Sequence, residues 1–62
     1  MNSYIDRGRV FFYGNCWYVE LYEGEQIFIE QHPSTNFCQD RDEDKDIEVI
    51  IKNKKAEFIR FI

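Results

Sequence analysis

The chain has 62 residues, eleven aromatic side chains and a net charge of −4, which indicates one small domain over residues 1–62. A domain of this length buries only about 60% of its unfolded surface, so a dense core or a partner must supplement it. The charge disfavours nucleic acid as a partner, because residues 20–48 carry ten acids against two bases and phosphate binding relies on clustered lysine and arginine.

The first predicted hairpin joins strands over residues 8–13 and 16–22. Gly14-Asn15 is a two-residue turn signal with glycine at the first central position, as a type II′ turn requires. This turn places Phe11 opposite Tyr18, and directly opposed residues share a face of the sheet. The other face becomes the predicted core face, with Val10, Phe12, Trp17, Val19 and Leu21.

The next strand is predicted over residues 25–31. A three-residue loop with Gly24 in the left-handed position pairs Val19 with Ile27, whereas a two-residue loop would turn the apolar residues away from the core. Once the core face is filled, aromatic residues remain on the opposite face. They form one row of three rings with a tyrosine on either side: Phe11, Tyr18 and Phe28, flanked by Tyr13 and Tyr22.

Two interpretations of this aromatic row remain open. In the first, the sheet curls and another part of the chain covers the row. In the second, the row is an exposed patch that binds a partner or a second copy of the chain. Tyrosine and tryptophan are enriched where protein interfaces gain most of their binding energy, which agrees with the second interpretation.

Residues 31–46 break the strand pattern and predict one long acidic loop, with room for a short helical turn over residues 34–38. Aspartates at alternate positions imitate the start of an EF-hand calcium loop. The imitation fails because Lys45 stands where glycine is needed and Ile51 where glutamate is needed. We therefore expect no metal site, and we interpret four acids as a solvated segment that contacts a partner: Asp40, Asp42, Glu43 and Asp44.

The C-terminal stretch predicts a second hairpin, with strands over residues 46–52 and 56–62. A three-residue turn near Asn53 pairs Val49 with Ile59 and makes one face apolar. Five strands and no helix of three turns predict an all-β fold. We expect a small five-stranded antiparallel barrel or a strongly twisted meander sheet, with one long acidic loop.

The N-terminal sequence MNSYIDRGR lacks the apolar segment of a secretory signal, and no apolar run approaches the about 20 residues that cross a bilayer. We expect a cytoplasmic protein without membrane contact, in which Cys16 and Cys38 are buried or half-buried thiols and a disulfide between them is the minor alternative. Together with His32, these cysteines lack the paired spacing of a zinc site.

No catalytic or cofactor-binding motif occurs in the sequence. His32 and Cys38 are a conceivable nucleophile and base, but a sheet this small has little concavity in which to hold a substrate. We therefore expect neither an enzyme nor a cofactor.

The favoured function is a small acidic protein-binding module: an inhibitor, adaptor or antitoxin-like regulator of the kind that phage and mobile-element accessory genes encode. It would dock the aromatic face and the acidic loop on a larger protein, and a homodimer is an equal alternative. The other function class is a β-barrel that stacks single-stranded nucleic acid on Phe11, Tyr18 and Phe28.

Overall fold

The computed structural model describes residues 2–30 and 37–62 of the chain. Within these two ranges, five strands and one short helix follow each other along the sequence. In chain order they are β1 (Ser3–Tyr13), β2 (Cys16–Leu21), β3 (Gln26–Phe28), α1 (Gln39–Asp42), β4 (Asp46–Lys52) and β5 (Lys55–Phe61).

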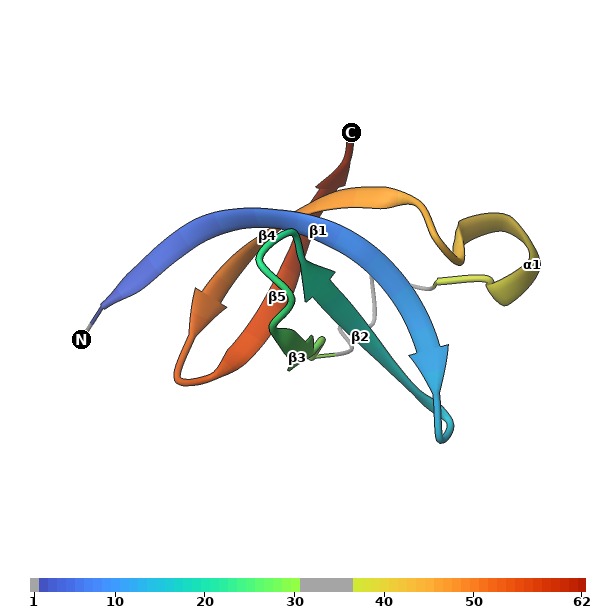
Figure 1. Ribbon diagram of the computed structural model, residues 1–62, viewed down its shortest axis with the longest axis horizontal. Coiled ribbons are helices and arrows are strands. Elements are labelled where there is room, and N and C mark those ends of the chain that lie inside the picture. Colours follow the sequence, from blue (N-terminus) through green and yellow to red (C-terminus); the bar gives the residue numbers. More distant parts are fainter. Residues whose placement is uncertain (1, 31–36) are drawn as a thin grey trace.

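The strands form one antiparallel sheet in the order β3-β2-β1-β4-β5 (Figure 1). The central strand, β1, pairs with β2 through residues 8–13 and with β4 through residues 3–9. Three consecutive strands with the fourth returning beside the first make a Greek key. The predicted all-β antiparallel fold is confirmed, although β1 begins at Ser3 and not at residue 8.

The sheet curls strongly but does not close. Just after β3, Ile29 forms a single parallel bridge to Ala56 of β5, and the Glu30 N–H donates to the Ala56 carbonyl oxygen at 2.8 Å. A partly open, five-stranded Greek-key barrel with the third strand beside the fifth has the connectivity of the OB fold.

Gly8 lies where β1 passes from one partner strand to the other, because it is opposite both Leu21 and Ile47. It is buried, and a Cβ atom added there would collide with the backbone carbonyl of Glu20. Only glycine lets β2 approach β1 this closely while β1 also pairs with β4.

The first hairpin has the predicted register, with Phe11 opposite Tyr18 and Tyr13 opposite Cys16. Its turn type differs from the prediction. Gly14 and Asn15 have φ angles of 57° and 66°, and two central residues with positive φ define a type I′ turn, not II′. Asparagine tolerates the left-handed conformation, so the pair fits the turn that best matches strand twist.

The second turn is the predicted three-residue loop. Gly24 has a φ angle of 105°, its N–H donates to the Leu21 carbonyl at 2.8 Å, and Val19 lies opposite Ile27. Beyond β3 the register continues through a bond from the Ile29 N–H to the Trp17 carbonyl at 2.9 Å.

The predicted register of the C-terminal hairpin is only half right. Ile47 lies opposite Phe61, but a bulge at Glu48/Val49 then places Val49 opposite Phe58 instead of Ile59. The turn holds two residues, Asn53-Lys54, both with positive φ. The extra residue that we expected in the turn lies in the bulge, where Ile59 is left 42% exposed.

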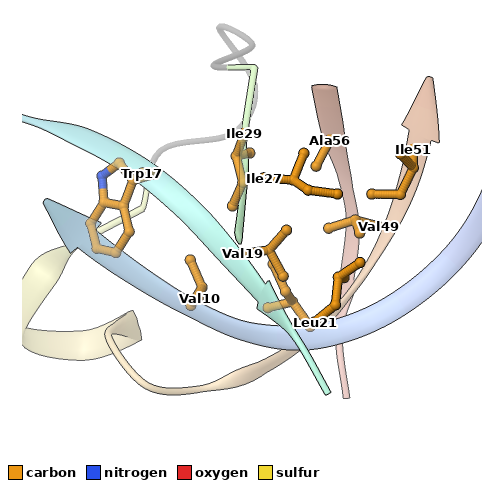
Figure 2. Close-up of a cluster of buried hydrophobic side chains, with 10 residues drawn as sticks. Val10, Trp17, Val19, Leu21, Ile27, Ile29, Val49, Ile51 and Ala56 are labelled. Carbon is orange, nitrogen blue, oxygen red and sulfur yellow. The ribbon is translucent and has the colours of Figure 1, made fainter. Parts of the chain in front are cut away.

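The core lies between the two halves of the curled sheet, where side chains from β2 and β3 meet those from β4 and β5 (Figure 2). Trp17 is 7% exposed, as its place on the predicted core face requires. The buried hydrophobic residues are Val10, Trp17, Val19, Leu21, Ile27, Ile29, Ile47, Val49, Ile51 and Ala56.

Phe37 extends this core towards the open side of the barrel. Its ring lies 5.2 Å from Trp17 of β2 and 5.1 Å from Phe58 of β5, measured between centroids. Most of the helical turn for which we left room, over residues 34–38, falls outside the described residues. Cys38 has an extended backbone, and α1 starts only at Gln39.

Candidate interaction surface

The outer face of β1, β2 and β3 carries the predicted aromatic row, and its rings touch one another. Phe11 and Tyr18 are stacked with centroids 5.5 Å apart and planes 18° apart. Tyr18 meets Phe28 edge to face at 5.9 Å. The row follows from the register, since Phe11, Tyr18 and Phe28 lie opposite each other on adjacent strands.

The row remains partly open to solvent. Phe11 and Tyr18 are half-buried and Phe28 is 36% exposed. Tyr13, two residues after Phe11 on β1, is 72% exposed. A shallow depression on this face is lined by Phe11, Tyr13, Tyr18 and Gln26. We did not single out Gln26, although its register position opposite Glu20 places it on this face.

Tyr22 belongs to the turn that follows β2, which ends at Leu21. Partial loss of hydration and a hydrogen bond to Asp46 raise the pKa of the Tyr22 hydroxyl above its usual value. Its hydroxyl therefore stays protonated at neutral pH and is a donor next to the outer face of β4.

Carboxylates surround the row. Glu20 stands opposite Arg9 on one side, and Glu30, on the other, forms an ion pair with Lys55 at 3.5 Å. Glu23 and Glu25 are exposed around the turn between β2 and β3. Among these residues four carboxylates stand against two bases, Arg9 and Lys55, so the strands that carry the row and their connecting turn are rich in acids.

Basic groups elsewhere on the sheet are held by acids. Glu48 accepts from the Nε atoms of Arg60 at 2.9 Å and Arg7 at 3.3 Å. The bond from Arg60 contributes most to lowering the pKa of Glu48, and the bond from Arg7 adds to it. Both guanidinium groups are thus partly neutralised.

Asp42 corrects our interpretation of the acidic segment. We expected a solvated carboxylate that contacts a partner, but Asp42 is 1% exposed. It accepts the Cys38 N–H at 2.8 Å and two bonds from Arg41, each 2.7 Å long. The hydrogen bonds and charge of Arg41 lower the pKa of Asp42 to about 2, against the effect of burial. Asp42 therefore holds α1 together and is not available to a partner.

The other acids of the segment stay accessible and lie beside β1. The Asp44 N–H donates to the Val10 carbonyl at 2.8 Å, and the Val10 N–H donates to the Lys45 carbonyl at 3.0 Å. Asp40 and Asp44 are exposed, while half-buried Glu43 accepts the Phe12 N–H at 3.5 Å. The acidic segment thus adjoins the β1 side of the aromatic row.

Residues 2–30 and 37–62 assemble no metal centre. Within these ranges no group of three or more His, Cys, Asp or Glu residues is placed to hold a metal ion. Cys16 and Cys38 are free thiols, half-buried and exposed respectively. His32, the conceivable base for Cys38, lies outside the described residues.

Over the same ranges, no helix is both long and apolar enough to cross a membrane. Comparison of the chain with protein families, with curated proteins and with solved structures finds no match in any of the three.

Proposed function

We propose that this protein is a small acidic protein-binding module that docks its outer aromatic face on a larger protein. The supporting observation is the contiguous row of Phe11, Tyr18 and Phe28, which is partly exposed although the rings pack on one another. Rigid, pre-assembled aromatic side chains lose little entropy on binding, which is why interfaces use them as anchors.

The charges around the row favour a partner with basic groups. Asp40, Asp44, Glu23 and Glu25 are exposed. By contrast, Arg7 and Arg60 are bound to Glu48. Arginine or lysine of the partner would meet carboxylates at the rim and ring faces at the centre, where cation–π attraction contributes about 0.5–2 kcal/mol. Such a module acts as an inhibitor, adaptor or antitoxin-like regulator in the cytoplasm, where thiols stay reduced.

Affinity capture from an extract of the source cell tests this proposal. The baits are the wild type, Phe28→Lys and Ile59→Lys. Phe28 and Ile59 are similarly exposed, at 36% and 42%, but only Phe28 belongs to the row. A specific partner should be lost with Phe28→Lys and retained with Ile59→Lys. When the binding of the purified partner to each bait is then measured, the affinity should be lowest for Phe28→Lys and similar for Ile59→Lys and the wild type.

Thermal unfolding of the three baits checks that each is folded. Equal capture by all three, or equal loss with both variants, would show that the aromatic row does not select the partner.

A second candidate, binding of single-stranded nucleic acid, is favoured by the Greek-key connectivity. Barrels of this type bind oligonucleotides on the outer face of strands 2 and 3 and stack bases on aromatic rings. Phe28 and Tyr18 lie on those two strands. The acidic rim opposes this function, so we rank it second.

Titration of a fluorescent oligonucleotide between about 50 and 200 mM salt separates the two functions. Binding that weakens steeply with salt would support the nucleic-acid function. No binding at the lower salt concentration would remove it.

A further inference from the structure

The N-terminal half of β1 has one unpaired edge. Residues 3–7 pair with β4 on one side, whereas β2 reaches only as far as Gly8, opposite Leu21. In Figure 1 this half of β1 arches away beyond the end of β2. Tyr4 and Ile5 on this segment are 51% and 61% exposed.

The backbone pattern shows which groups face the open edge. Both the N–H and the carbonyl of Val10 bond on the β4 side, to Lys45 and Asp44. Because these groups alternate along a strand, even-numbered residues of β1 face β4 and odd-numbered residues face the other edge. Ser3, Ile5 and Arg7 therefore face outward.

One of these outward donors is already satisfied. The Arg7 N–H donates to Oδ1 of the neighbouring Asp6 at 2.8 Å. Among the described residues, Ser3 and Ile5 thus keep both their N–H and their carbonyl groups for a further strand. An edge of this kind is a template for pairing with another chain.

We propose that this edge pairs with the same edge of a second copy, antiparallel and about a two-fold axis, with Tyr4 opposite Tyr4. This register joins Ser3 of each copy to Ile5 of the other and uses every free outward group of those residues. Only residues of equal parity can oppose each other across such an axis, so the register one step towards the C-terminus is centred on Ile5 and the following one on Asp6.

The registers centred on Ile5 and on Asp6 are both less favourable than the register centred on Tyr4. Centring on Ile5 requires the Arg7 N–H that Asp6 already holds. Centring on Asp6 places two carboxylates opposite each other, which is destabilising. The register centred on Tyr4 instead places the Asn2 amide opposite Asp6, a donor against an acceptor.

The expected dimer is weak, because two short segments bury less than a standard interface. It is also useful to a binding module. A two-fold axis perpendicular to a sheet keeps the same face of both copies on the same side. The dimer therefore carries two aromatic rows related by the two-fold axis, which raises avidity for a partner with repeated sites.

Sedimentation equilibrium from low micromolar to near-millimolar concentration tests the dimer. The wild type should dimerise with concentration, and Ile5→Pro should weaken association at least tenfold, because proline removes an outward N–H that makes no bond within the chain. Ile5→Thr keeps that N–H and should associate like the wild type. A wild type that stays monomeric throughout, or an Ile5→Pro variant that associates equally well, would overturn the proposal.

Cross-linking tests the register without relying on the proline variant. With Cys16 and Cys38 changed to serine, Tyr4→Cys should form a disulfide between copies, because the α-carbons of directly opposed, non-hydrogen-bonded residues lie about 4.5 Å apart. Ile59→Cys, exposed on β5, is the control. Cross-linking of Tyr4→Cys no faster than Ile59→Cys would contradict the register.

Discussion

The two faces of the β1–β2 hairpin are built from neighbouring residues with similar apolar content, yet they differ in what encloses them. Trp17 points inward and is 7% exposed, whereas Tyr18 points outward and remains half-exposed beside Phe28. The inner face is covered by β4, β5 and Phe37. The outer face has no cover among the described residues beyond its own rings. Whether other parts of the chain cover a face, more than which residues it carries, therefore decides whether its side chains stabilise the fold or remain accessible for binding.

The largest expected effect is that of Trp17→Ala. The Trp17 ring contacts Phe12 and Phe37 at centroid distances of 5.0 and 5.2 Å, and its removal leaves a cavity in the core. We expect a loss of about 3–5 kcal/mol in the free energy of unfolding, measured by chemical denaturation. Tyr18→Ala on the outer face is the matched control and should cost clearly less. Equal losses would mean that the two faces do not differ as described.

Gly8→Ala should be the next most damaging change, although it adds a single methyl group. The new Cβ would lie 2.9 Å from Cγ2 of Val19 and would collide with the Glu20 backbone, which cannot move without separating β2 from β1. We expect a loss near the upper end of about 1–3 kcal/mol, measured as above. Gly14→Ala separates the two causes, because no atom lies within 4 Å of its added Cβ and its cost comes from the left-handed φ of 57° alone. A Gly8→Ala variant as stable as the wild type would mean that the strands approach less closely than described.

Asp42→Asn should cost about 1–3 kcal/mol at neutral pH, because a buried carboxylate that accepts charged hydrogen bonds is replaced by a neutral amide. The exposed Asp40→Asn change in the same helix should stay within about 0.5 kcal/mol. Equal losses of stability in the two variants would show that the Asp42 carboxylate is solvated like that of Asp40.

The cost of Asp42→Asn should also depend on pH. The folded pKa of Asp42 is about 2, below its ordinary value of 3.8, so the charged carboxylate stabilises the fold above pH 4. This contribution should disappear as the pH falls from about 4 through about 2, where wild type and variant converge. Denaturation curves at several pH values measure the difference, and a difference that is constant down to pH 2 would contradict the ion pair.

The smallest expected effect is that of Tyr13→Ser. Tyr13 is 72% exposed at the end of β1, so the free energy of unfolding should change by no more than about 0.5 kcal/mol. The same variant should weaken binding to the partner captured through the aromatic row. A stability loss comparable to that of Trp17→Ala would show that the outer face belongs to the core.

Local signals in the sequence predicted much of the sheet. Gly14-Asn15 and Gly24 set the two registers of the β1–β2–β3 meander, because a shift of one residue would reverse every side chain. The aromatic row follows directly from those registers. The bulge opposite Val49 could not be located in this way, since Phe58 and Ile59 are both apolar and the pattern is satisfied by either.

Non-local structure was the part that the sequence did not reveal. Ser3–Arg7 shows no clear alternation, and its strand conformation depends on β4, about 40 residues away. Asp42 was missed for a related reason. In a run of five acids among seven residues, nothing in composition distinguishes the one carboxylate that turns inward beside Arg41.

The sharing of β1 between two partner strands has a consequence for folding kinetics. The β1–β2, β2–β3 and β4–β5 turns each close a short loop, whereas the β1–β4 ladder joins residues as far apart as Ser3 and Lys52, 49 positions along the chain. The entropy of that long closure must be lost before its contacts form, so this ladder should limit the folding rate. Each doubling of a loop costs only about 0.6 kcal/mol, and lengthening the connection between β3 and β4 should therefore slow folding while leaving the native sheet nearly as stable.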